Sequence, residues 1–120
     1  MGRTLAVAAL FLALASGTAK DVRQDYDDIR LCQATAFWEF WLVHDVTKPE
    51  NSMSYGESVM LGRQGVVLGK QLGMTAKDVA ADLRTAREGY ARKYQAKATT
   101  DSGADLFKSN RRYCHGKSLL

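Results

Sequence analysis

The sequence predicts an all-α fold, a single small bundle of about four helices held by one disulfide bond. Apolar residues recur at the spacing that places them on one side of a helix, and they do so in successive segments along the chain. No segment alternates apolar and polar residues over the length of a strand. Two cysteines, Cys32 and Cys114, lie far apart in the chain and are placed to join the first helix to the last. A chain of 120 residues is long enough for one domain with its own core.

The N-terminal segment has the three parts of a secretory signal peptide. Arg3 supplies a positive charge, residues 5–15 are an uncharged apolar run, and small residues lead up to a cleavage site after Ala19. The apolar run is too short to span a bilayer. We therefore expect residues 1–19 to be removed and residues 20–120 to form a single periplasmic or secreted domain that is not an integral membrane protein.

The predicted export of the chain determines the expected oxidation state of its two cysteines. In an oxidising compartment, Cys32 and Cys114 are predicted to pair. Closing so long a loop removes entropy from the unfolded chain and stabilises the fold by about 4 to 5 kcal/mol. A domain of this size has only a modest hydrophobic core, so a covalent link of this strength matters for its stability.

The first predicted helix, residues 28–46, contains both tryptophans and is apolar on almost every side. One stripe on this helix has the spacing of a core face and consists of Ile29, Cys32, Ala36, Phe40 and Val43. On its other sides, Trp38, Trp41 and Leu42 present more apolar surface than three lighter helices are expected to cover. These three side chains are therefore predicted to form a binding interface. The polar residues 20–27 are expected to precede the helix.

Glu39 lies among the apolar residues of this helix, where a charged group needs a partner. The expected partner is a cation or a hydrogen-bond donor from another helix, such as an arginine or a tyrosine. The alternative is a general acid in an aromatic pocket, although glycosidase chemistry requires a second carboxylate and the sequence designates none. Glu39 is included with the tryptophans among the candidate binding residues.

A loop with the only proline, residues 47–52, separates this helix from a second one at residues 55–72. Ser54 and Glu57 have the spacing of an N-terminal capping box. Glycines on one side of the second helix indicate that a bulky group approaches its backbone closely, and they are Gly62, Gly65, Gly69 and Gly73. The aromatic side chains of the first helix are the expected bulky groups, and a close helix crossing between two subunits is the alternative. Gly73 alone is more simply a C-terminal cap.

Two further helices complete the predicted bundle. Thr75 and Asp78 have capping spacing and begin a third helix at residues 76–98. Its apolar stripe consists of Val79, Leu83, Ala86, Tyr90 and Tyr94. After a short polar break, a fourth helix covers residues 104–115. The end of the chain, residues 117–120, is expected to be a loose tail.

The charge of the predicted mature chain is uneven. Residues 20–76 contain 6 basic and 8 acidic residues, whereas residues 77–120 contain 10 basic and 5 acidic residues. The basic C-terminal half is a candidate docking surface, with Arg111 and Arg112 as its candidate binding residues. The chain has neither the charge nor the recognition helix typical of a nucleic-acid-binding module, so no nucleic-acid partner is expected.

Catalytic and metal-binding motifs are absent from the sequence. It contains only two histidines, His44 and His115, and no Gly-x-Ser-x-Gly, His-Glu-x-x-His or Cys-x-x-Cys pattern. We therefore expect no cofactor and no metal site, and we favour a non-catalytic role. The predicted function is that of an exported helical binding protein, whose partner is another protein or a second copy of the chain.

Two other functions are compatible with the same residues. An envelope carrier or chaperone would use the aromatic helix as one wall of an apolar pocket beside Trp38 or Trp41. A small hydrolase would centre on Glu39 and a second carboxylate in the same cleft. In size, export and helix content the chain resembles small bacterial periplasmic helical proteins such as the immunity proteins that neutralise secreted cell-wall hydrolases. This resemblance implies an inhibitor that plugs a hydrolase active site with a loop or helix end and docks through its basic C-terminal half.

Overall fold

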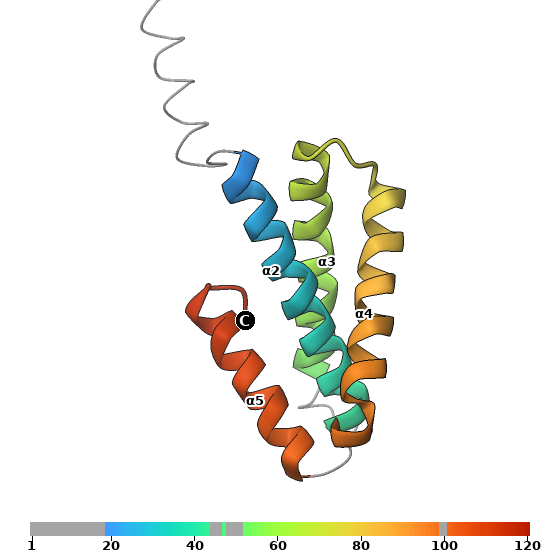
Figure 1. The fold of residues 1–120 in the computed structure, drawn as a ribbon, viewed down its shortest axis with the longest axis vertical. Helices are drawn as coiled ribbons and strands as arrows, with labels where there is room; N and C mark the ends of the chain where they lie inside the picture. The colour runs from blue at the N-terminus through green and yellow to red at the C-terminus, as the bar shows by residue number, and fades with distance from the viewer. Residues whose placement is uncertain (1–18, 44–46, 48–51, 99–100) are drawn as a thin grey trace, which may run out of the picture.

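The computed structural model describes residues 19–43, 47, 52–98 and 101–120, and every regular element in these ranges is a helix. The elements are α2 (Ala19–Trp38), the π-helical turn η1 (Glu39–Val43), α3 (Ser52–Gln71), α4 (Ala76–Ala98) and α5 (Asp101–Gly116). The predicted all-α bundle is therefore confirmed (Figure 1). The predicted signal peptide lies outside the described residues except for Ala19.

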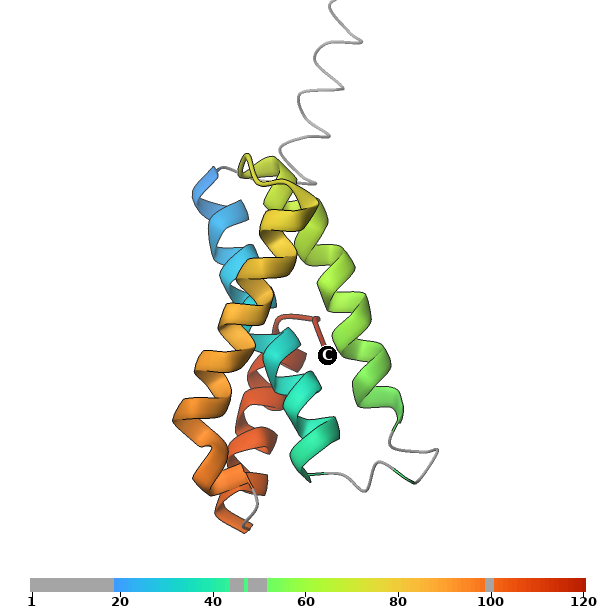
Figure 2. The ribbon, with the colours of Figure 1, turned by 90° about the vertical axis from the view of Figure 1, so that its right-hand side faces the viewer.

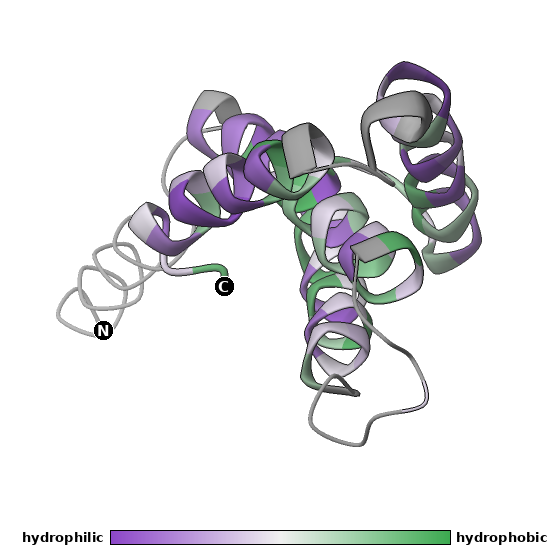
Figure 3. Ribbon diagram, turned by 90° about the horizontal axis from the view of Figure 1, so that it is seen from below, coloured by the Kyte–Doolittle hydropathy of each residue, from purple (hydrophilic) through white to green (hydrophobic). Residues whose placement is uncertain are grey.

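The central helix of the bundle is α2, which contacts the other three helices. α3 and α4 form an antiparallel pair joined by a turn, and α5 packs against α2 and α4 (Figure 1). In the view turned by 90°, α3 and α4 diverge from their connecting turn and the C-terminal part of α2 lies between them (Figure 2). Hydrophilic residues predominate on the outward sides of α4 and α5, and apolar residues gather toward the interior (Figure 3).

The N-terminal half of α2 corrects the prediction for the start of the first helix. α2 begins at Ala19, so the expectation that residues 20–27 precede the helix is wrong. Val22 and Tyr26 extend the apolar stripe of Ile29 toward the N-terminus, and all three side chains are buried. The stripe was not recognised in the sequence because the neighbouring aspartates are typical of a solvated segment.

Three polar side chains of α2 bind other helices. The Tyr26 hydroxyl donates a hydrogen bond to Asp82 Oδ2 of α4 at 2.6 Å, and Arg30 Nε lies 3.1 Å from the same carboxylate oxygen. Asp28 is buried and accepts a hydrogen bond from the Tyr113 hydroxyl of α5 at 2.7 Å. Burial raises the pKa of Tyr26, and its hydrogen bond to Asp82 raises it further. The polar residues thus fasten α2 to its neighbours.

The start of α3 also differs from the prediction. The helix begins at Ser52, so Ser54 lies inside it and does not cap it, contrary to the predicted capping box. The Ser54 hydroxyl is buried and donates instead to Glu39 Oε1 at 3.2 Å. The predicted C-terminal cap at Gly73 is confirmed by its φ of 84° and by a hydrogen bond from Met74 N to Gly69 O at 2.8 Å.

Two of the predicted glycines, Gly65 and Gly69, do receive a close neighbour, but the nearest neighbour is aliphatic, and Gly62 has no atom within 4 Å of an added Cβ. A Cβ atom at Gly69 would overlap Cγ2 of Val79, and one at Gly65 would lie 3.4 Å from Cγ2 of Ile29. The side chains that approach the backbone therefore come mainly from α4 and from the N-terminal half of α2. The prediction that the large aromatic residues of the first helix fill this space is wrong, because those residues lie further along α2.

α4 follows its prediction closely, whereas α5 begins at Asp101, three residues before the predicted start at residue 104. α4 has the predicted bounds, and Thr75 and Asp78 cap it reciprocally, with hydrogen bonds of 3.0 and 3.1 Å. The Cys32–Cys114 disulfide is present, and both residues are fully buried.

The predicted loose tail, residues 117–120, is wrong. The chain turns back at Ser118, whose φ is 59°, and Leu119 N donates to Cys114 O at 2.9 Å. Leu119 and Leu120 pack against the core cluster that contains the disulfide. Packing of these two apolar side chains favours the folded-back conformation over a solvated one.

Candidate functional site

The structure separates the three apolar residues that were predicted to form an interface. Trp38 is half-buried against Tyr90 and Phe107, and its Nε1 donates a hydrogen bond to Arg87 O at 2.8 Å. Leu42 packs on the same cluster. Trp41, in contrast, is 49% exposed. Of the three, only Trp41 therefore offers substantial apolar surface to a partner.

Glu39, the first residue of η1, is buried and bound by a cation from another helix. Arg111 Nε lies 3.0 Å from Glu39 Oε1, and its Nη1 and Nη2 each lie 3.1 Å from an oxygen of Glu57 in α3. Burial alone would lower the pKa of Arg111, but the hydrogen bonds to the two glutamates raise it. One guanidinium therefore links α5, η1 and α3, in the ion pair that the burial of Glu39 requires.

The two candidate binding arginines of α5 consequently differ in how accessible their charges are to a partner. Arg111 is engaged by Glu39 and Glu57, whereas Arg112 is exposed. Together with Lys108, His115 and the C-terminal turn, they border a shallow basic depression. Arg111 contributes mainly to the fold, because its guanidinium is bound by Glu39 and Glu57.

Among the described residues, most of the exposed large apolar side chains lie on α3, which the sequence did not single out for binding. Five large apolar residues of this helix are exposed, namely Met53, Tyr55, Val59, Met60 and Val67. Trp41 continues this surface, because its ring packs on Phe40 at 5.0 Å and Phe40 packs on Tyr55 at 5.4 Å between ring centroids. α2 covers one side of α3, and α4 covers less of it, so much of the helix faces solvent.

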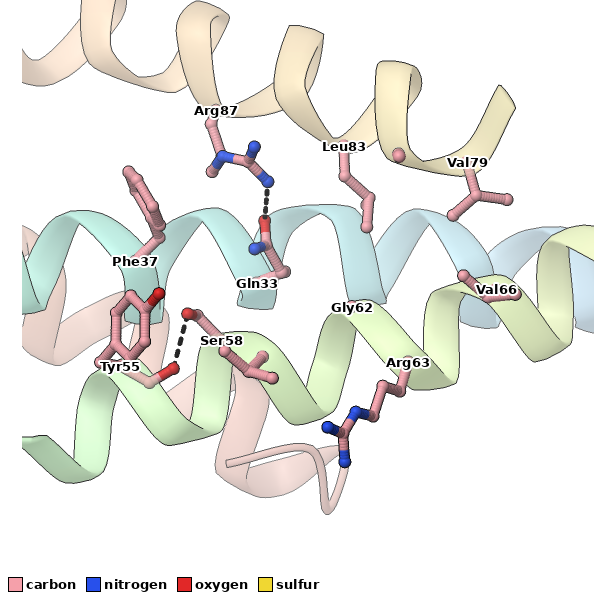
Figure 4. A pocket seen from close by; sticks show the side chains of 12 residues that line it. Gln33, Phe37, Tyr55, Ser58, Gly62, Arg63, Val66, Val79, Leu83 and Arg87 are labelled. Atoms are coloured by element: carbon pink, nitrogen blue, oxygen red, sulfur yellow. Dashed lines mark hydrogen bonds between the residues drawn. The ribbon is translucent and has the colours of Figure 1, made fainter. Parts of the chain in front are cut away.

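A groove runs between α3 and α4, with α2 as its floor (Figure 4). Its volume is about 370 Å³. Its walls are mostly apolar and consist of Tyr55, Val59, Gly62 and Val66 from α3 and of Val79, Ala80 and Leu83 from α4. Phe37 lines it from α2, next to Tyr55 (Figure 4). Neither tryptophan lines this groove, and neither does Glu39 or Glu57.

Arg87 is the polar residue that α4 extends toward the floor of the groove. Its Nη1 donates a hydrogen bond to Gln33 Oε1 at 3.2 Å, and its guanidinium lies 4.9 Å from the centre of the Phe37 ring (Figure 4). Burial lowers the pKa of Arg87, and the nearby positive charge of Arg84 lowers it further, with partial compensation from Glu88. The site thus combines an apolar groove with a partly desolvated cation.

A seven-residue repeat in α3 is the sequence signal that could have pointed to this site. Residues 59–64 read V-M-L-G-R-Q and residues 66–71 read V-V-L-G-K-Q. Seven residues are close to two helical turns, so equivalent positions share one side of the helix. The two leucines face the core, the first valine of each copy lines the groove, and Met60 and Val67 are exposed.

The described residues were compared with the requirements of a metal site and of a membrane-spanning helix. Across residues 19–43, 47, 52–98 and 101–120, no three histidine, cysteine or acidic side chains are grouped so that they could hold a metal ion. No helix in the same ranges combines the length and the apolar character needed to cross a membrane. Of the two histidines in the sequence, His44 lies outside the described residues.

Comparison with known proteins finds no family model, no curated protein and no solved structure that matches this chain.

Proposed function

We propose that residues 20–120 form an exported binding domain that docks a segment of a partner protein in the groove between α3 and α4. The observation that carries this proposal is the exposed apolar surface of α3, which continues from the groove onto Trp41 of η1. Surfaces of this kind are costly to leave in water and typically mark an interaction site. Tyr55 and Trp41 are of the residue types that most often dominate binding energy.

The geometry favours protein binding over the two alternative functions. A carrier would enclose an apolar ligand, but this groove is open to solvent and lies away from both tryptophans. A hydrolase would leave one carboxylate available to its substrate, but Glu39 and Glu57 both bind Arg111 and neither lines the groove. An inhibitor that covers a secreted enzyme is one form of the proposed function.

A capture experiment with matched variants tests the proposal. Tagged residues 20–120 are incubated with an extract of exported proteins from the cells that make the chain. The wild type is compared with Val59→Glu, which places a charge on the groove wall, and with Thr85→Glu, a control on an exposed position of α4 that does not line the groove.

A partner retained by the wild type and by Thr85→Glu, but lost with Val59→Glu, is the expected result. Light scattering on the same three proteins shows whether the partner is a second copy of the chain. Equal retention of every bound protein by the wild type and both variants, together with equal molar masses, would contradict the proposal.

A further inference from the structure

We infer that the segment bound in the groove is an amphipathic helix with acidic residues along its flanks. The inference rests on the proposed function of the same groove and adds the chemistry of the partner. Its basis is that both charged residues lining the groove, Arg63 and Arg87, are cations, one on each wall.

Neither arginine forms an ion pair with another residue of the described ranges. Arg63 is exposed at the outer edge of α3 and makes no hydrogen bond or ion pair among the described residues (Figure 4). Arg87 is half-buried, and its guanidinium contacts the neutral Gln33 amide and the Phe37 ring. A partly desolvated cation without a counter-ion is unfavourable, and a carboxylate from a partner would relieve that cost.

One further exposed cation lies on α3, because Lys70 follows Arg63 by one repeat. On α4, Arg84 and Glu88 pair with each other at 3.3 Å, so their charges offset one another. A partner with acidic flanks is therefore attracted from both sides, while a basic partner is repelled.

The shape of the groove favours a helix as its occupant. Its walls present side chains at helical spacing, with Val59, Gly62 and Val66 on α3 facing Val79 and Leu83 on α4. Such walls alternate ridges and holes that a third helix can fill. Gly62 leaves one hole open, because a Cβ atom there would meet nothing within 4 Å. An extended peptide would find no strand edge for backbone pairing among the described elements.

Three designed peptides test the inference without knowledge of the natural partner. Each has 18 residues and the same leucine stripe at positions i, i+3, i+4 and i+7, and the flanking positions carry glutamate, glutamine or lysine. Titration calorimetry with residues 20–120 is expected to give a dissociation constant about 10-fold lower for the glutamate peptide than for the glutamine peptide. The lysine peptide is expected to bind most weakly, and 0.5 M salt is expected to remove most of the difference.

Two glycine variants of α3 show whether binding occurs in the groove. Gly62→Leu fills the hole in the wall, whereas Gly56→Leu adds the same side chain to the same helix outside the groove, where a Cβ atom also meets nothing within 4 Å. We expect Gly62→Leu to abolish peptide binding and Gly56→Leu to retain it. Arg87→Gln should reduce the preference for glutamate, and Arg87→Lys should preserve part of it. Thermal melting curves establish that each variant is folded.

The inference is overturned if the three peptides bind with equal affinity or if none of them binds. It is also overturned if Gly62→Leu and Gly56→Leu bind the glutamate peptide with equal affinity, or if the groove binds laurate and not the peptides. If Val59→Glu loses the captured partner while the peptides show no charge preference, the acidic helix is wrong and the proposed function stands. If Val59→Glu keeps every captured protein, the proposed function itself fails.

Discussion

Replacing Arg111 by methionine tests how strongly the buried network around Glu39 stabilises the fold. Methionine keeps a long side chain but leaves Glu39, which is 5% exposed, without the cation that binds it. Removing one partner of a buried ion pair costs about 3 to 5 kcal/mol. The Arg111 side chain is itself 31% exposed. Because water can reach part of the site, we expect a loss of about 3 kcal/mol in the free energy of unfolding, at the lower end of that range.

Urea denaturation of residues 20–120, followed by far-ultraviolet circular dichroism, measures this loss. Arg112→Met is the matched control, because Arg112 is the next residue and is exposed, and it should change the free energy by less than about 0.5 kcal/mol. Adding Glu39→Gln to Arg111→Met removes the uncompensated charge and should restore about 1 kcal/mol. The reasoning is refuted if Arg111→Met and Arg112→Met lose equal stability, or if the double variant recovers none.

The other predictions concern the disulfide, the glycines of α3 and alkaline pH. Replacing both Cys32 and Cys114 by serine opens a loop with a sequence separation of 82 and should cost about 4 kcal/mol in urea denaturation; an unchanged midpoint would contradict this. Gly69→Ala should lower the melting temperature because its Cβ overlaps a valine of α4, whereas Gly62→Ala should raise it by removing glycine's entropy cost in open space. The folded-state pKa of Tyr26 is raised above its unfolded value of 10.0, so its contribution to stability is present below pH 10 and is lost as the pH rises further. Stability measured from pH 8 to 11.5 should therefore fall above pH 10, and Tyr26→Phe should flatten that fall.

Local signals account for what was predicted correctly about the fold. The bounds of α4 follow from the reciprocal cap of Thr75 and Asp78 and from the Gly73 turn before it, and these involve residues close in sequence. The burial of Val79, Leu83 and Tyr90 follows from their helical spacing. Such features are short-range, so the sequence is sufficient to predict them.

The predictions were wrong where a residue distant in the sequence determines the contacts of a side chain in a local pattern. Ser54 looks like a helix cap, but its hydroxyl binds Glu39, fifteen positions away. The aspartate-rich start of α2 looks like a solvated segment, but Asp28 binds Tyr113 at the other end of the chain. Trp38 looks like an interface residue, but α4 supplies the carbonyl oxygen that binds its indole.

The sequence was enough to predict the helical class, the positions of α3 to α5 within a few residues and the pairing of Cys32 with Cys114. Periodicity and caps depend on nearby residues, and the chain has only two cysteines to pair. Which apolar residues stay uncovered depends on how the helices pack. α3 and α4 diverge from their shared turn, and this divergence exposes Val59 and leaves Arg87 facing an open groove. Burial depends on where neighbouring helices lie, and a linear pattern does not contain that information.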